Sequence, residues 1–157
     1  MAALRLTSPA FAHDEPLPAR FTADKENVSP PFAWEGVPAE TKELVLICDD
    51  PDGEEGVVTH WVVYGLLPDS TGLPEGIPDD AVVEDDTTSL VQGLNEFDEV
   101  GYTGPSLDVD SVPHRIFFRL FALSIETTHL QPGITRAELR KAVKDHILAR
   151  AELVAIA

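Results

Sequence analysis

Short apolar segments separated by turns that contain proline or glycine run along most of this chain. The clearest segments cover residues 44–48, 60–67 and 116–124, and weaker ones lie near residues 3–7 and 32–34. Prolines remove backbone donors and glycines allow positive φ, so turns of this density limit each segment to the length of a strand. The pattern predicts a mainly β fold.

Two segments indicate how the predicted sheet is covered. Residues 44–48 are apolar throughout, which is typical of a strand buried on both faces. Alternation over residues 114–121 defines two faces, one with His114, Ile116, Phe118 and Leu120, and the other with Arg115, Phe117, Arg119 and Phe121. We expect the arginines to be partly covered and paired. The acidic, turn-rich residues 73–99 are expected to be exposed and irregular.

The C-terminal part of the chain carries the clearest helix signal. Thr135 and Glu138 form a capping-box pattern behind the Pro132-Gly133 turn. Apolar positions then recur at helical spacing, at Leu139, Ala142, Val143, His146, Ile147, Leu153 and Val154. We expect an amphipathic helix that packs on the sheet, with docking on a partner subunit as the alternative.

Length and composition describe one globular domain over residues 1–157. The chain is 43% hydrophobic and 25% charged, and a chain of this length can bury a core without a metal or disulfides. Its one cysteine, Cys48, lies in an apolar run and is expected to be a packed thiol. The first twenty residues lack the pattern of a signal peptide, so a cytoplasmic location is expected.

The charge is strongly negative, with 28 acidic and 11 basic residues and a formal net charge of −17. Phosphate backbones and anionic membranes need a basic face, so nucleic-acid binding and membrane insertion are not expected. Such a surface stays soluble in high salt, which suggests a halophilic source. The basic residues concentrate after residue 110, so anion binding should depend on His114, Arg115 and Arg119.

Polar residues recur beside strand ends and turns. They are Asp50 and Asp52, His60, the Gly104-Pro105 turn, and His114. Read from residue type alone, Asp50, Asp52, His60 and His114 could form a metal set, or Cys48, Ser106 or Ser111 could be a nucleophile beside a histidine. The alternative is a purely structural role, in which both aspartates cap turns and both histidines are core residues. No hydrolase, zinc-protease, P-loop or dinucleotide motif is present.

Five motifs in order carry a resemblance. They are residues 28–38 (VSPPFAWEGVP), 49–52 (DDPD), 59–64 (THWVVY), 101–105 (GYTGP) and 113–115 (PHR). Together they resemble the phosphatidylethanolamine-binding protein family, most closely its prokaryotic Raf-kinase-inhibitor-like branch. The likeness extends from about Leu6 to about Val154.

The resemblance implies a mainly β, sandwich-like fold with a large central sheet, a smaller sheet and a C-terminal helix. It also implies a non-enzymatic binding protein with a small anion pocket for a phosphate or carboxylate head group and no cofactor. Carried over by position, Asp50 and Asp52 line this pocket, His60 and His114 face the ligand, and the backbone around Gly104 and Pro105 contributes donors. Imidazoles and turn amides are suitable donors to such an anion.

The sequence departs from the family pattern near the predicted pocket. Asp108 and Asp110 follow the Gly-Pro turn and should weaken binding of a doubly charged phosphate, and Ile116 replaces a tyrosine that helps to hold the anion in eukaryotic relatives.

The resemblance leaves open whether the protein has a kinase or protease as a partner and whether it forms a homodimer. The enzymatic alternative is a small hydrolase or isomerase in which Asp50 or Asp52 acts with His60 as an acid–base pair.

Overall fold

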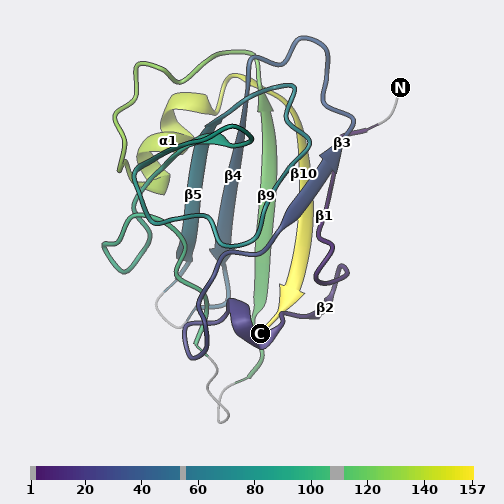
Figure 1. Cartoon of the computed structure of the whole chain (residues 1–157), viewed down its shortest axis with the longest axis vertical. Coiled ribbons are helices and arrows are strands. Elements are labelled where there is room, and N and C mark those ends of the chain that lie inside the picture. The colour runs from purple at the N-terminus through teal and green to yellow at the C-terminus, as the bar shows by residue number, and fades with distance from the viewer. Residues whose placement is uncertain (1–2, 54–55, 107–111) are drawn as a thin grey trace.

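Two β-sheets form most of the molecule in the computed structural model, which describes residues 3–53, 56–106 and 112–157 (Figure 1). Within these residues the larger sheet has seven strands in the order β2-β10-β9-β4-β5-β8-β7. In chain order its strands are β2 (Glu15–Pro16), β4 (Glu43–Asp50), β5 (Val58–Leu66), β7 (Val82–Glu84), β8 (Ser89–Gln92), β9 (Arg115–Leu123) and β10 (Ile147–Ile156). Every pairing in it is antiparallel except that of β10 with β2.

The smaller sheet has three strands in the order β1-β3-β6 over the same described residues. The remaining elements are β1 (Arg5–Thr7), β3 (Phe32–Glu35), β6 (Gly72–Leu73), the 3-10 helix η1 (Ala19–Phe21) and the helix α1 (Arg136–Val143). In the part of the chain that the structure describes, every helix falls short of the length and apolarity that a bilayer crossing needs.

The large sheet is covered on both faces. One face packs with the small sheet and the N-terminal segment in a core that includes Leu6, Trp34, Trp61 and Phe118. The opposite face packs against α1 through Leu139 and Val143, together with other apolar side chains of β4, β5 and β9. The central strand β4 is buried along its whole length, as its apolar sequence predicts.

The strand predictions agree with these elements. All five predicted segments overlap strands, and in β9 the side chains of Ile116, Phe118 and Leu120 are fully buried as the alternation requires. Cys48 is also fully buried, which confirms the packed thiol. The prediction for residues 73–99 is wrong in part, because β7 and β8 pair there and Gln92 is fully buried.

The predicted C-terminal helix is present but much shorter than expected. Thr135 caps α1 with the complete capping box that its spacing with Glu138 predicts. The prediction that the helix continues to Val154 is wrong, because residues from Ile147 onward form β10 and pair with β9 over its full length. Backbone pairing with β9 therefore overrides the helix propensity of this alanine- and leucine-rich segment.

Candidate functional site

The predicted site residues gather at one end of the large sheet, the lower end in Figure 1. Strand β4 ends at Asp50, whereas its antiparallel neighbours β5 and β9 begin at Val58 and Arg115. Antiparallel strands place the end of one beside the start of the next. Residues far apart in the sequence are thus brought to the same end of the sheet. We call this end, with Asp50, His60 and His114, the His60 edge.

A β-bulge sets the position of His60. The register of β4 and β5 pairs Cys48 with Trp61 and Asp49 with Thr59, which leaves His60 as the extra residue. A bulge of this kind re-aims a side chain that regular alternation would place elsewhere. The His60 side chain is buried, and its Nδ1 donates a hydrogen bond of 2.8 Å to the carbonyl oxygen of Thr103.

The second ring nitrogen of His60 is unsatisfied. Among the described residues Nε2 has no hydrogen-bond partner, and it is closed to solvent. Burial lowers the pKa of His60, and this effect outweighs the Thr103 hydrogen bond and the carboxylates of Asp50 and Asp49, which act in the opposite direction. The neutral ring therefore carries its proton on Nδ1, and Nε2 presents a buried lone pair.

His114 is oriented by a carboxylate. Its Nδ1 donates to Asp50 Oδ2 at 2.6 Å, and the other oxygen of Asp50 accepts the backbone N–H of Asp52 at 2.8 Å. The backbone of His114 exchanges two hydrogen bonds with Ala157, of 2.6 and 2.9 Å. Hydrogen bonds thus fix both the ring and the backbone of His114. The ring is about one-third exposed, whereas the Asp50 side chain is buried.

Asp52 forms an ion pair with Arg115. It accepts hydrogen bonds from the Arg115 backbone N–H at 3.0 Å and from Nε and Nη2 at 3.2 Å each. These bonds hold the pKa of Asp52 below its usual range. The guanidinium that the sequence suggested for anion binding is therefore already occupied by a carboxylate of the same site.

The Gly104-Pro105 turn forms a packed wall. The Gly104 N–H donates to the side-chain oxygen of Asn27 at 2.8 Å, and the Pro105 carbonyl accepts from Ala23 N at 2.9 Å. The expectation that backbone donors face a ligand here is thus wrong for Gly104 itself, because Asn27 already uses its amide. A Cβ on Gly104 would lie 2.1 Å from the Phe21 carbonyl oxygen, so any side chain at this position forces the backbone to shift.

The remaining predicted residues do not add donors to this edge in the part of the chain that the structure describes. Arg119 lies on the opposite face of the large sheet, where it contacts Asp49 and Glu152. The position of Ile116 is fully buried and supplies no donor. Ser111, Asp108 and Asp110 lie outside the described residues.

The structure also narrows the chemical alternatives. Asp50 bonds His114 and Asp52 bonds Arg115, so the predicted pairing of either aspartate with His60 is not the one observed. Burial and the neighbouring carboxylates raise the pKa of the Cys48 thiol well above its ordinary value, which argues against a nucleophile. No group of three metal-ligating side chains forms among the described residues, which include all four candidate ligands.

Three side-chain or backbone contacts at this edge were not predicted from the sequence, although Thr103 lies within the 101–105 motif. Asn27 caps the Gly104 amide, Thr103 orients His60, and the ring of Phe97 lies 6.0 Å from the His60 ring, centroid to centroid. Each acts across 37 or more positions of sequence. Asn27, with φ of 56°, carries only the weak local signal of a residue type that tolerates the left-handed region.

The comparisons with known proteins agree with this architecture. The family model described as phosphatidylethanolamine-binding protein matches residues 7–157. A UPF0098 protein of Methanothermobacter thermautotrophicus is 43% identical over 153 residues, covering 98% of this chain and 97% of the relative. A UPF0098 protein of Aquifex aeolicus is 38% identical, covering 99% of this chain and 88% of the relative.

Solved structures give the same result. A phosphatidylethanolamine-binding protein homologue from Chlamydia trachomatis superposes with a TM-score of 0.86 at 36% identity, covering 99% of this chain and 97% of that one. Escherichia coli YbcL, described as a member of the mammalian family, superposes with a TM-score of 0.85 at 27% identity, covering 99% and 98%. The chain therefore belongs to the phosphatidylethanolamine-binding protein family, in the prokaryotic branch that includes the UPF0098 proteins and YbcL.

Proposed function

We propose that this protein is a non-enzymatic binding protein that holds a small phosphate- or carboxylate-bearing head group between His60 and His114. The observation that carries the proposal is the buried Nε2 of His60, which has no partner among the described residues. Buried polar atoms are almost always hydrogen-bonded, and an exception calls for an explanation such as an absent ligand. His114, fixed by Asp50, supplies a second imidazole at the same edge.

The protonation state of His60 predicts how an anion binds. Because the lowered pKa keeps the ring neutral and Nδ1 holds the proton, Nε2 donates to an anion only after it takes up a proton. An anion beside the ring stabilises the imidazolium and draws that proton in. Binding is thus coupled to proton uptake, and affinity rises as the pH falls.

Access to His60 also requires a movement. Nε2 is closed to solvent, and the half-exposed ring of Phe97 lies next to the His60 ring. We infer that Phe97 shifts when the head group enters. At this edge Asp52 is paired with the guanidinium of Arg115, and Asp50 accepts a hydrogen bond from His114. The charge of Asp52 therefore repels an anion less than the net charge of the chain suggests.

Isothermal titration calorimetry with phosphoethanolamine, inorganic phosphate and acetate tests the proposal. We expect the wild type to bind at least one of these, more tightly at pH 5.5 than at pH 7.5, and His60→Gln and His114→Gln to bind about tenfold or more weakly. His129→Gln, at an exposed histidine, is the matched control and should bind like the wild type. Equal affinities in all four proteins, or no binding to the wild type, would refute the proposal.

A further inference from the structure

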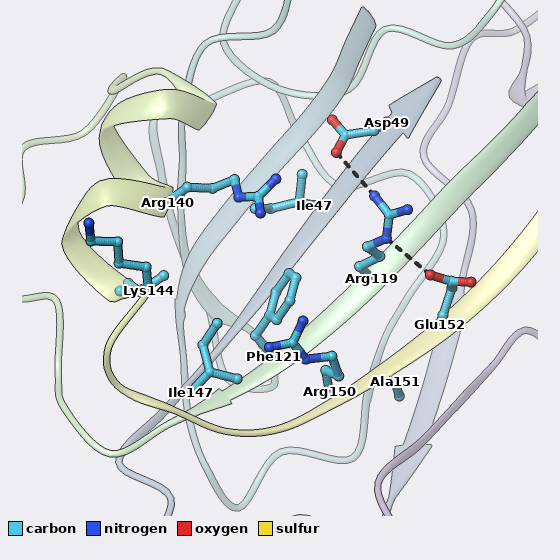
Figure 2. Close-up of a pocket in the computed structure, with 11 residues that line it drawn as sticks. Ile47, Asp49, Arg119, Phe121, Arg140, Lys144, Ile147, Arg150, Ala151 and Glu152 are labelled. Carbon is cyan, nitrogen blue, oxygen red and sulfur yellow. Dashed lines mark hydrogen bonds and ion pairs between the residues drawn. The ribbon is translucent and has the colours of Figure 1, made fainter. Parts of the chain in front are cut away.

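A separate cavity of about 620 Å³ lies between α1 and the opposite face of the large sheet (Figure 2). Its floor is apolar and comes from β4, β9, α1 and β10, through Ile47, Phe121, Val143 and Ile147. Of the residues predicted for anion binding, Arg119 lines this cavity, whereas Asp50, Asp52, His60, Gly104, Pro105 and His114 do not. A volume of this size suits a small organic ligand with an apolar body.

The polar lining is basic. Arg119, Arg140, Lys144 and Arg150 line the cavity, against two carboxylates, Asp49 and Glu152. Four of the 11 basic side chains of a chain with net charge −17 therefore meet at one cavity. A local excess of positive charge within an acidic surface is a place where an anion is attracted.

Both carboxylates already have arginine partners. Arg119 lies between them, with Nε 3.1 Å from Glu152 Oε2 and Nη1 3.6 Å from Asp49 Oδ2. Arg136, at the start of α1, donates a further hydrogen bond of 2.9 Å to Asp49. Two arginines thus pair with the two acids at one end of the cavity, through Oδ2 of Asp49, whereas Asp49 Oδ1 is buried and has no hydrogen-bond partner among the described residues.

The other cations are left without an acid. The ion pairs of the described residues include none with Arg140, Lys144 or Arg150. The guanidinium of Arg150 lies over the Phe121 ring, 5.9 Å from its centroid. The C-terminal end of α1 favours basic side chains such as Arg140 and Lys144. This effect does not explain Arg150, which lies on β10. Figure 2 shows the Arg140 and Arg150 side chains extending over the apolar floor from opposite sides.

We propose that this cavity binds a small amphiphilic organic anion. Its carboxylate is held by the guanidinium groups of Arg140 and Arg150, and its apolar body lies on Ile47, Phe121 and Ile147. Guanidinium groups bind carboxylates through paired, charge-assisted hydrogen bonds, and the fixed floor selects against fully hydrated ions such as phosphate. Because the site lies on the face opposite to His60, it is independent of the head-group site.

Calorimetry with naphthalene-2-carboxylate and with its neutral counterpart naphthalene-2-methanol tests this site. We expect the wild type to bind the carboxylate at least about tenfold more tightly than the alcohol, and the double variant Arg140→Gln/Arg150→Gln to lose about tenfold or more in affinity for the carboxylate. Lys141→Gln, an exposed position on the same helix that does not line the cavity, is the charge-matched control and should bind like the wild type. Equal binding of acid and alcohol, no binding of the acid, or equal affinity in the double variant overturns the proposal.

Amide chemical shifts of the labelled protein locate the ligand. We expect naphthalene-2-carboxylate to shift the amide signals of Ile47, Phe121 and Val143 and to leave those of His60 and Thr103 unchanged. His60→Gln should bind this ligand like the wild type, whereas it loses the head group under the function proposed above. The substituted arginines are exposed, so the fold should persist. If the double variant fails to fold, the single variant Arg150→Gln replaces it, with an expected loss of about threefold or more. Shifts confined to the His60 edge contradict the proposal.

Discussion

Asp49 and Asp50 are neighbours in the sequence, yet their carboxylates serve opposite faces of the large sheet. Asp50 accepts a hydrogen bond of 2.6 Å from His114, and Asp49 accepts one of 2.9 Å from Arg136 at the start of α1. The end of β4 therefore contributes to the His60 edge on one face and anchors α1 on the other. Strand alternation alone accounts for the separation.

The anchor at Asp49 predicts the effect of removing Arg136. The Asp49 side chain is 3% exposed, and Arg136 is its closer cation. Arg136→Ala leaves a buried carboxylate with Arg119 alone, so we expect the free energy of unfolding to fall by about 1–3 kcal/mol. Urea denaturation measures the change. Lys141→Ala, at an exposed position of the same helix, is the control and should change stability by less than about 0.5 kcal/mol.

The lowered pKa of His60 predicts a dependence of stability on pH. In the unfolded chain the ring titrates near its ordinary value of 6.5, and in the folded protein it titrates lower. Between these two values the unfolded state binds more protons, so stability falls as the pH falls below about 6.5. We expect His60→Gln to lose less stability than the wild type between pH 7 and pH 5, with a difference in slope of at most about 1.4 kcal/mol per pH unit.

Denaturation at several pH values measures this difference. The slopes are compared rather than the absolute stabilities, because substitution of a buried histidine also changes packing. His129→Gln, at an exposed position, should follow the wild-type slope. A His60→Gln slope equal to that of the wild type would show that burial does not depress the His60 pKa.

The packing of Gly104 predicts a steric effect. A Cβ at this position meets the Phe21 carbonyl oxygen at 2.1 Å and the Tyr102 hydroxyl at 2.9 Å. The backbone of Phe21 belongs to η1 and cannot yield locally, so we expect Gly104→Ala to lower the free energy of unfolding by about 1–3 kcal/mol. Ser106→Ala, two residues on and exposed, should be nearly neutral in the same thermal or chemical melt. A Gly104→Ala variant as stable as the wild type contradicts this account.

The main strands and the residues of the His60 edge could be predicted from the sequence. Continuous apolar runs and period-two alternation follow from burial, which is local information, and they locate β4, β5 and β9. Ordered motifs brought Asp50, His60 and His114 together through the family resemblance. The sequence could not show that Asp52 would bond Arg115 or that Asn27 would use the Gly104 amide, because both contacts depend on the fold of distant segments.

In the segment after α1 the helical spacing of apolar residues predicts a helix that is too long. Residues from Leu139 to Ile147 carry apolar positions at helical spacing, and alanine and leucine continue the helical composition beyond them. What ends the helix is tertiary: β9 offers a free edge along its whole length, and β10 fills it. The cavity beneath α1 could not be predicted either, because it depends on the short helix turning back into that strand.

The clamp between Asp52 and Arg115 predicts a change in titration. Hydrogen bonds from Arg115 hold the pKa of Asp52 below its ordinary value of 3.8. Arg115→Gln keeps the backbone N–H bond but removes the charge and the guanidinium donors, so we expect the pKa of Asp52 to rise toward 3.8. Carboxyl carbon signals followed by NMR between pH 2 and pH 6 measure the shift. Arg5→Gln, whose partner is the exposed Glu35, is the control and should leave the Asp52 titration unchanged. An unchanged Asp52 titration in Arg115→Gln would mean that the guanidinium is not held on the carboxylate and is available to an anion.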